Sequence, residues 1–328
     1  MSLVLAIDGG NSKTDVALVR DDGSLLGLAR GTGSSPHHLG REQSLDVVDA
    51  LVEQLAPPEQ PELTLLLMAG VDFPEEEHAL EELVARRRWA KRIAVRNDTF
   101  AVLRAGTDRG WGIAVVCGAG INCVGVAPDG RHHRFPALGP NTGDWGGGQD
   151  VGQEALYAAA RSEDGRGPRT RLERDVSEYF NLATPADVAY EIHRGRLDQT
   201  RLVELAPIVF AAAADDAVAA AIVARLVTEV VALVRVTAQR LGLEEADLDV
   251  VLGGGLLQDA DETLVAEIER GVHATAPLAV VRPTAAPAVL GSALLALDEL
   301  GAPDAAKSRL RTEFEGRTSP VTIGGLDG

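Results

Sequence analysis

The alternation of apolar and polar positions divides the 328-residue chain into short strands and longer helices. Short apolar runs bounded by glycine, asparagine, aspartate or proline predict buried strands. In the first third of the chain these strands are expected at Leu3–Ile7, Val16–Arg20, Leu25–Ala29, Leu63–Met68 and Ile93–Val95. Apolar residues spaced three and four apart predict helices over residues 41–55, 75–88 and 100–104.

The strand pattern starts again near residue 111 and repeats the first. Ile113–Val116 and Asn122–Val126 flank a glycine turn and are followed by an Asp-Gly turn, as in the opening segment about 110 residues earlier. This internal duplication predicts two related lobes. The rest is mainly helical, with further strands at Leu248–Leu252 and Ala279–Val281. Helices are expected near residues 150–160, 170–180, 186–193, 199–214, 217–241, 261–270 and 287–299.

Composition and charge exclude several classes of protein. The chain has 31 basic and 49 acidic residues, a formal net charge of −18, whereas nucleic acid and anionic membranes attract clustered positive charge. We therefore expect no nucleic-acid partner and no membrane partner. The stretch from Ala217 to Val236 is apolar but interrupted by charges, which predicts a buried helix of a soluble protein. The opening residues are typical of a strand rather than a signal peptide, so we expect a cytoplasmic location.

Glycine clusters follow predicted strands at three places. Glycine lets backbone N–H groups approach a ligand closely, as a phosphate cradle requires, although any one cluster is also explained by a tight turn. Three clusters at strand ends together favour nucleotide binding. The clusters are Asp8-Gly9-Gly10, Gly118-Ala119-Gly120 and Gly253-Gly254-Gly255.

Three aspartates are candidates for catalysis or ligand binding because of their positions next to predicted strands or glycine turns. Asp8 ends a strand beside a glycine turn, where it could hold Mg²⁺ or cap the turn. Asp98 lies between a strand and a helix, as a general base or as an N-cap. Asp144 lies with Trp145 in a glycine-rich run, which favours a sugar-binding platform over a plain surface loop. Lys13 could contact phosphate or remain solvated.

The cysteines and histidines show no metal-site pattern. Cys117 and Cys123 flank the second glycine turn, and we expect two buried thiols that act as small hydrophobes. The paired histidines His37-His38 and His132-His133 are adjacent and lack the i, i+4 spacing of a helical metal site.

Together, the order of these motifs resembles the N-acetylglucosamine kinase branch of the BadF/BadG/BcrA/BcrD ATPase family, in the sugar kinase, Hsp70 and actin superfamily. The resemblance covers roughly residues 3–300. It implies an α/β protein, a two-lobed actin-like ATPase fold with duplicated ribonuclease-H-like domains that close over ATP and sugar. The motifs that carry it are Ala6–Thr14, Asn97-Asp98-Thr99, Cys117–Cys123, Gly143-Asp144 and Leu252–Gly255.

The resemblance also implies a role for each motif. Asp98 would be the catalytic base on the sugar hydroxyl, expected to be O6, and Asp8 would organise Mg²⁺. ATP would contact Asp8, Gly9, Gly10, Asn11, Ser12, Lys13, Gly118, Ala119, Gly120, Gly253 and Gly254. The sugar would contact Ser35, Asp98, Asn122, Gly139 and Asp144.

The implied lobes divide the chain unequally. The N-terminal lobe would span residues 1–110 and be completed by a helix at about 287–302, and the C-terminal lobe would span 111–286. Residues 303–328 show little periodicity, so we expect a partly disordered tail. A homodimer through the helical lobe is left open.

The chain departs from the family at expected sugar contacts. Ser35 stands where N-acetylglucosamine kinases usually carry asparagine, and Trp145 follows Asp144 where the family commonly has glutamate. Phosphoryl transfer is therefore better supported than the sugar, and a kinase for another sugar such as glucosamine stays open. Two other classes also stay open: an ATPase activator of a radical dehydratase, which would hold an iron–sulfur cluster through cysteines, and a nucleotide-dependent regulator without catalysis.

Overall fold

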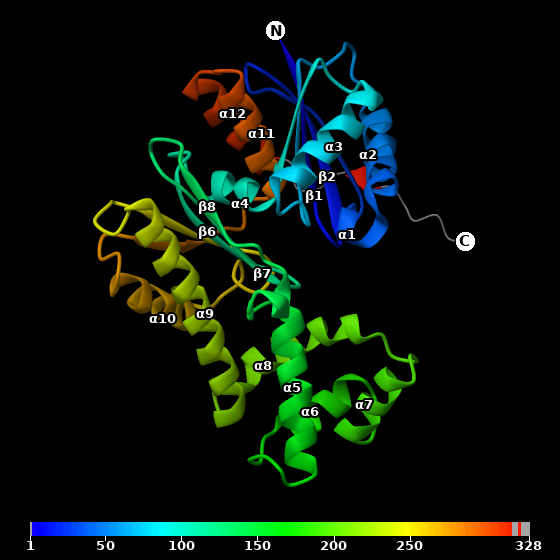
Figure 1. Ribbon diagram of the computed structural model, residues 1–328, viewed down its shortest axis with the longest axis vertical. Helices are drawn as coiled ribbons and strands as arrows, with labels where there is room; N and C mark the ends of the chain where they lie inside the picture. Colours follow the sequence, from blue (N-terminus) through cyan, green and yellow to red (C-terminus); the bar gives the residue numbers. More distant parts are fainter. Residues whose placement is uncertain (1, 317–320, 323–328) are drawn as a thin grey trace. The chain divides into compact units, whose positions relative to one another are not determined.

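The computed structural model describes residues 2–316 and 321–322, which form two compact units (Figure 1). Unit 1 comprises Met1–Trp111 and Thr284–Gly328, and unit 2 comprises Gly112–Pro283. The chain therefore leaves unit 1 once and returns to it near its end.

Unit 1 is built on a six-stranded sheet with the order β11-β3-β2-β1-β4-β5. Strands β1, β2 and β3 form an antiparallel meander, whereas β4 and β5 run parallel to β1. The carboxyl ends of β1, β4 and β5 consequently meet at one edge of the sheet. The strands are β1 (Leu3–Gly9), β2 (Lys13–Arg20), β3 (Leu25–Thr32), β4 (Leu63–Met68), β5 (Arg92–Asn97) and β11 (Val321–Thr322).

Helices cover both faces of this sheet, as in α/β proteins whose parallel strands are buried on both sides. Alternate side chains of a strand point to opposite faces: Leu5 and Ile7 of β1 pack with α2 and α3, whereas Ala6 packs with α11. A Cβ on Gly291 of α11 would lie 1.8 Å from the Ala101 carbonyl oxygen, so glycine permits α11 to cross α4 closely. The helices are α1 (Pro36–Leu39), α2 (Arg41–Leu55), α3 (Pro74–Arg87), α4 (Thr99–Gly106), α11 (Ala288–Glu299) and α12 (Asp304–Glu315).

Unit 1 differs from the sequence-based expectation at two places. Asp8 and Gly9 belong to β1, opposite Asp15 and Thr14 of β2, so the turn is tighter than expected. The tail expected to be partly disordered contains α12, because Ala306, Leu310 and Phe314 are buried on one helical face. The remainder of the expected tail, at 317–320 and 323–328, lies outside the described residues.

Unit 2 repeats the strand order of unit 1. Its five-stranded sheet has the order β10-β9-β6-β7-β8, in which β6, β7 and β8 are antiparallel and β9 and β10 run parallel to β6. This matches β5-β4-β1-β2-β3 strand for strand and direction for direction, so the fold is a duplicated α/β unit. The strands are β6 (Gly112–Cys117), β7 (Ile121–Val126), β8 (His132–Arg134), β9 (Asp249–Gly253) and β10 (Val280–Pro283).

A helical insertion between β8 and β9 distinguishes unit 2 from unit 1. Its long helix α9 lies against β6 and β7, where a Cβ on Gly125 would be 2.3 Å from the Thr237 side chain. Among the described helices, only α9 is long and apolar enough to cross a membrane, which is weak support for a span because core helices meet the same criterion. The helices are α5 (Gly148–Glu163), α6 (Leu172–Tyr179), α7 (Pro185–His193), α8 (Ala206–Ala212), α9 (Ala217–Leu241) and α10 (Glu262–His273), with 3-10 turns η1 (Gly139–Asn141) and η2 (Gln199–Leu205).

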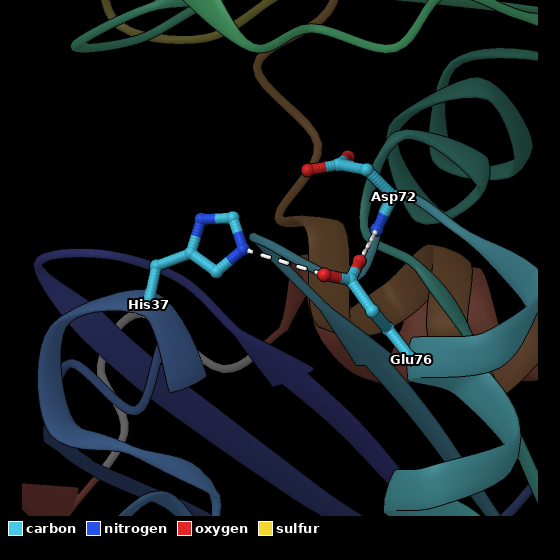
Figure 2. Close-up of side chains that lie close together, drawn as sticks. All are labelled: His37, Asp72 and Glu76. Carbon is cyan, nitrogen blue, oxygen red and sulfur yellow. Dashed lines mark hydrogen bonds and ion pairs between the residues drawn. The ribbon is translucent and has the colours of Figure 1, made fainter.

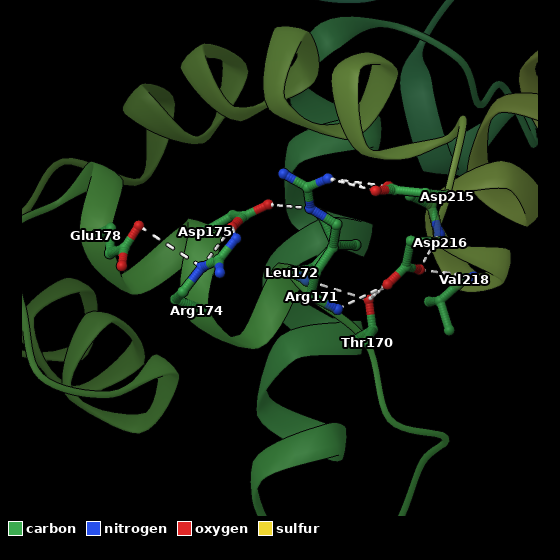
Figure 3. Close-up of polar contacts among 10 residues, drawn as sticks. Thr170, Arg171, Leu172, Arg174, Asp175, Glu178, Asp215, Asp216 and Val218 are labelled. Carbon is green, nitrogen blue, oxygen red and sulfur yellow. Dashed lines mark hydrogen bonds and ion pairs between the residues drawn. The ribbon is translucent and has the colours of Figure 1, made fainter.

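One carboxylate ties two helices of this insertion together (Figure 3). Asp216 caps α9 by accepting hydrogen bonds from the backbone N–H groups of Val218 and Ala219, both at 2.9 Å. Its other oxygen accepts from the N–H of Arg171 and the hydroxyl of Thr170. Asp216 thus holds the start of α6 against the start of α9.

Candidate functional site

Two acids of unit 1 lie together at the carboxyl edge of its sheet. Asp8 is the penultimate residue of β1, and Asp98 follows β5, with its N–H donating to the Met68 carbonyl at the end of β4 (3.3 Å). Burial and, after it, the negative charges of Asp98 and Asp15 raise the pKa of Asp8 to about 8, against the opposing effect of Lys13 and Arg30. The parallel strand order therefore brings the first and second predicted acids into electrostatic contact.

The helix-capping alternative for Asp98 is not what the structure shows. Within the described residues, the Asp98 side chain makes no hydrogen bond to the start of α4. The Asn97 side-chain oxygen instead accepts from the backbone N–H of Thr99 (3.1 Å), and the Asn97 amide donates to the Val71 carbonyl (3.2 Å) and to Asp72 (2.9 Å). Asn97 stabilises this turn, so the Asp98 carboxylate is not needed for it.

The first glycine turn packs directly on the segment that carries Ser35. A Cβ on Gly9 would lie 2.2 Å from the Met68 sulfur and 2.8 Å from the Ser34 hydroxyl, so only glycine fits. The Ser34 N–H donates to the Gly10 carbonyl (3.1 Å). The Gly10 N–H donates to the Lys13 carbonyl (2.9 Å) and is used within the turn. The following positions Asn11, Ser12 and Lys13 are exposed.

The buried Ser35 hydroxyl has no hydrogen-bond partner among the described residues. Its side chain is 1% exposed, and within the described part of the chain its oxygen has no hydrogen-bond partner. Buried polar atoms are nearly always paired, and the exceptions often mark a place where a ligand or water belongs. The sequence-based assignment of Ser35 to sugar binding remains a prediction, and this unsatisfied oxygen is consistent with it.

The donor set around Asp8 is suited to Mg²⁺. Mg²⁺ takes oxygen ligands, commonly one or two carboxylates together with phosphate oxygens and water. Asp8 and Asp98 supply carboxylates, and the raised pKa of Asp8 reflects its burial first and then the nearby negative charges of Asp98 and Asp15. A divalent cation would compensate these charges, so Asp8 is the residue that would hold the ion.

The second glycine turn of unit 2 lies at the N-terminus of α5. The N–H groups of Gly148 and Gln149 donate to the carbonyls of Gly118 (2.9 Å) and Ala119 (3.0 Å). A Cβ on Gly147 would come within 2.3 Å of the Ala119 carbonyl oxygen, so the two backbones are in direct contact. These two N–H groups are therefore used within unit 2, and the turn is brought next to the N-terminus of α5, the end of a helix that favours anions.

The third glycine cluster docks on the second. Gly254 has φ +80°, and a Cβ there would lie 2.4 Å from the Cys117 carbonyl oxygen. Gly253 pairs with Val116 in the sheet, and the Leu256 N–H donates to the Cys117 carbonyl (3.1 Å). The glycine clusters of unit 2, separated by more than 100 residues in sequence, therefore form one backbone-lined surface.

The residues expected to bind sugar in unit 2 lie on two elements. Asn122 is in β7, where its side-chain oxygen accepts from the Cys123 N–H (2.7 Å). Gly139 (φ +62°) and Asp144 close one loop, because the Asp144 N–H donates to the Gly139 carbonyl (3.1 Å). Thr142 donates its hydroxyl to the Asp144 carboxylate, which orients that side chain.

Trp145 does not offer an open platform. The Arg225 guanidinium lies 4.0 Å over its indole ring, and the ring packs against the helical core of unit 2. Cation–π contact explains the arrangement. The expected polar-plus-apolar platform of Asp144 and Trp145 is therefore covered on the face that Arg225 occupies.

The cysteines are enclosed as expected. Both are fully buried, and burial raises the pKa of the Cys117 thiol above its usual range and that of Cys123 to about 12. Metal ligation needs the thiolate, so these protonated thiols are poorly suited to an iron–sulfur cluster shared between subunits.

The sequence alone did not reveal which charged residues lie next to Asp8. Asp15 faces Asp8 across β1 and β2, and Arg30 holds Asp15 through two hydrogen bonds of 2.6 and 2.9 Å. Only the strand register reveals this arrangement, since Asp15 otherwise resembles any polar residue at a strand start. Asn97 belongs to the predicted Asn97-Asp98-Thr99 motif, but the sequence did not predict its hydrogen bond to Asp72.

Two curated proteins are similar to this chain over most of its length. A curated N-acetylmuramic acid/N-acetylglucosamine kinase from Clostridium acetobutylicum is 26% identical over 265 residues, 79% of this chain and 87% of that protein. An N-acetyl-D-glucosamine kinase from Dictyostelium discoideum is 24% identical over 313 residues, 90% of this chain and 98% of that protein.

The fold is shared with solved structures. A candidate N-acetylglucosamine kinase from Chromobacterium violaceum superimposes with a TM-score of 0.68 at 24% identity, covering 90% of this chain and 99% of that one. The sequence profile of the BadF/BadG/BcrA/BcrD ATPase family matches residues 5–296, which is most of the chain. Because this match covers more than half of the sequence, the chain belongs to the BadF/BadG/BcrA/BcrD ATPase family.

Proposed function

We propose that this protein is an ATP-dependent sugar kinase that phosphorylates N-acetylglucosamine, with O6 as the acceptor atom. The observation that carries the proposal is the electrostatic proximity of Asp98 to Asp8 at one sheet edge. The two curated relatives, one named as an N-acetylmuramic acid/N-acetylglucosamine kinase and the other as an N-acetyl-D-glucosamine kinase, support the choice of substrate. ATP as phosphoryl donor fits a cytoplasmic enzyme.

In this proposal Asp98 accepts the proton of the sugar hydroxyl. The hydroxyl oxygen forms a bond to the γ-phosphorus of ATP while the bond to the β,γ-bridging oxygen breaks, giving a sugar phosphate, ADP and a proton on Asp98. Such transfers depend on positioning and on charge stabilisation more than on covalent chemistry. A Mg²⁺ ion held by Asp8 would neutralise charge on the phosphates.

Each unit would contribute its own contacts to the substrates. In unit 1, Gly9–Lys13 would contact phosphate oxygens, and the unsatisfied hydroxyl of Ser35 would contact the sugar. In unit 2, Gly118–Gly120 would contact phosphate and Gly253 and Gly254 would contact adenosine. Asn122, Gly139 and Asp144 are the residues of unit 2 that would bind sugar hydroxyls.

The decisive experiment measures ATP consumption with a panel of sugars. The panel contains N-acetylglucosamine, N-acetylmuramic acid, glucosamine, N-acetylmannosamine and glucose, each with and without Mg²⁺. We expect the highest kcat/KM with N-acetylglucosamine and a product whose phosphorus couples to the C6 protons in NMR. A preference for glucosamine would change the sugar and keep the reaction, whereas no turnover with any sugar would favour the regulator class. A brown, iron-containing purified protein would favour the activator class.

A further inference from the structure

A second group of ligating side chains lies in unit 1, outside the residues assigned to phosphoryl transfer (Figure 2). His37 of α1 faces Asp72 and Glu76, which flank the start of α3. One ligating atom of each of these residues lies within 4.8 Å of the others. Figure 2 shows the imidazole and both carboxylates converging on a common space. The adjacent-histidine pattern in the sequence gave no sign of this, because the partners of His37 are 35 and 39 residues away.

Both carboxylates are held in place by hydrogen bonds from their own surroundings. One oxygen of Glu76 accepts from the N–H groups of Asp72 (2.8 Å) and Phe73 (3.1 Å), while the other faces His37 Nε2 at 3.8 Å. Asp72 accepts from the Asn97 amide (2.9 Å). Metal ligands are typically oriented by such outer hydrogen bonds, which fix their geometry before the ion arrives.

An unsatisfied buried hydroxyl lies beside the imidazole. Gly70 has φ +75°, and a Cβ there would lie 3.0 Å from His37 Cγ and 3.1 Å from the Ser35 oxygen, so both groups pack on the same glycine. Ser35 is 1% exposed, and its oxygen has no partner among the described residues. The Ser35 hydroxyl and the His37 imidazole therefore border the same small space beside Gly70. The Ser35 oxygen in this space has no hydrogen-bond partner among the described residues.

The cluster is accessible. A cavity of about 280 Å³ is lined by His37, Glu76, Gly70 and Arg41, among others. The His37 side chain is 49% exposed and that of Glu76 is 29% exposed. A hydrated ion can reach His37 and Glu76 through this cavity, and water can complete its coordination.

The ligand types indicate which ion fits. One imidazole and two carboxylates suit a first-row transition ion, whereas Mg²⁺ and Ca²⁺ take oxygen ligands almost exclusively. Three protein ligands with room for water match a zinc site with an open position. As a plain ion pair, the half-exposed His37–Glu76 contact would contribute little stability.

From this geometry we propose that His37, Asp72 and Glu76 form a binding site for a divalent transition metal ion, with Zn²⁺ as the fitting ion. The ion would join α1 to the start of α3. Because Ser35 and His37 lie on one short segment, the ion would also hold the Ser35 hydroxyl in place. The site would be separate from Asp8, which is suited to Mg²⁺.

Isothermal titration of the EDTA-treated full chain with Zn²⁺ tests the proposal, with Co²⁺ as a spectroscopic probe of imidazole and carboxylate ligation. We expect one site per chain, which a large excess of Mg²⁺ does not displace. Replacing an outer hydrogen-bond partner typically weakens metal binding about 10–100-fold, so His37→Gln and Glu76→Gln should each weaken it by about 100-fold or more.

His78→Gln is the matched control. His78 and Glu82 form an exposed pair on α3 with the same chemistry (3.4 Å), so a surface site of low specificity would involve them equally. We expect wild-type affinity in this variant and in His38→Gln. Thermal unfolding without metal checks that every variant folds.

Two results would overturn the proposal: no saturable Zn²⁺ binding to the wild-type chain, or equal binding by folded His37→Gln and Glu76→Gln variants. The readout is metal binding and not sugar phosphorylation. The outcome is therefore independent of the kinase proposal, which stands or falls with ATP consumption.

Discussion

The two units share a strand order and carry different chemistry at equivalent positions. In unit 1 the strand before the first glycine turn carries Asp8 as its penultimate residue, whereas in unit 2 the equivalent strand ends with Cys117. Among the parallel strands, Asp98 follows β5 of unit 1, whereas β9 of unit 2, the counterpart of β4, is followed by Gly254, which packs on the Cys117 carbonyl. Unit 1 thus presents carboxylates, and unit 2 presents backbone.

The difference follows from what each half must do. Holding a cation and taking a proton require ionisable side chains, and burying them costs free energy that shows in the raised pKa of Asp8. Lining a nucleotide needs close approach without side chains, which glycine allows. A duplicated fold can therefore specialise through the few residues that follow its strands.

The largest effect is expected from removing the Asp98 carboxylate of unit 1. Asp98→Asn should lower kcat by about 10²–10⁴, the usual contribution of a general base, and leave ATP binding unchanged. Steady-state kinetics with N-acetylglucosamine and ATP titration by calorimetry measure both. Asp129→Asn, at an exposed hairpin turn of unit 2, is the control. Near-normal turnover of Asp98→Asn would remove the assignment of the base.

The corresponding test of unit 2 alters backbone packing. Gly254→Ala places a Cβ against the Cys117 carbonyl at a positive φ, a strain of about 1–3 kcal/mol, and should raise the KM for ATP while kcat changes less. Gly255→Ala is matched, because no described atom outside its chain neighbours lies within 4 Å of the added Cβ. If the two variants bind ATP equally, the glycine surface is not where adenosine lies.

A smaller effect is expected in the helical insertion that unit 1 lacks. Asp216→Ala removes the cap of α9 and the link to α6, which should lower the free energy of unfolding of unit 2 by about 1–2 kcal/mol. Calorimetric unfolding measures the change. Asp215→Ala removes only an exposed ion pair with Arg171 and should have almost no effect. Equal melting temperatures for the two variants would contradict the assigned role.

The last effect concerns the dependence of stability on pH. The raised pKa of Asp8 means that the folded protein holds this proton more tightly than the unfolded chain. The associated stability is present below about pH 4, the carboxyl's ordinary pKa, and is lost as the pH rises through about 8. Asp8→Asn should therefore lose less stability than wild type between pH 5 and 8.

Between the two pKa values the change is about 1.4 kcal/mol per pH unit, and each 1 kcal/mol shifts the melting temperature by about 2–4 °C in a unit of this size. Scanning calorimetry at pH 5 and 8 without nucleotide measures it. An identical pH dependence in wild type and variant would show that Asp8 is ionised at ordinary pH without cost.

Local sequence patterns predicted most strands and helices because each apolar run has a length and periodicity of its own. The prediction was wrong for α12, whose buried residues Ala306, Leu310 and Phe314 are spaced four apart but lie among many charged positions. The strand expected at Leu3–Ile7 was also too short, because β1 continues past its last apolar residue to Gly9. In both places, contacts with the rest of unit 1 outweigh local propensity.

The sequence by itself determined the repeated strand–turn pattern, the glycine clusters and the aspartates at strand ends, because these depend on neighbouring residues along the chain. Only the tertiary structure decided which of them meet. Parallel pairing of β1, β4 and β5 puts Asp98 beside Asp8, and strand register adds Asp15. The crossover through α3 brings Glu76 to His37. Charges and ligands act through distances in space, and those distances are set by strand order and helix packing.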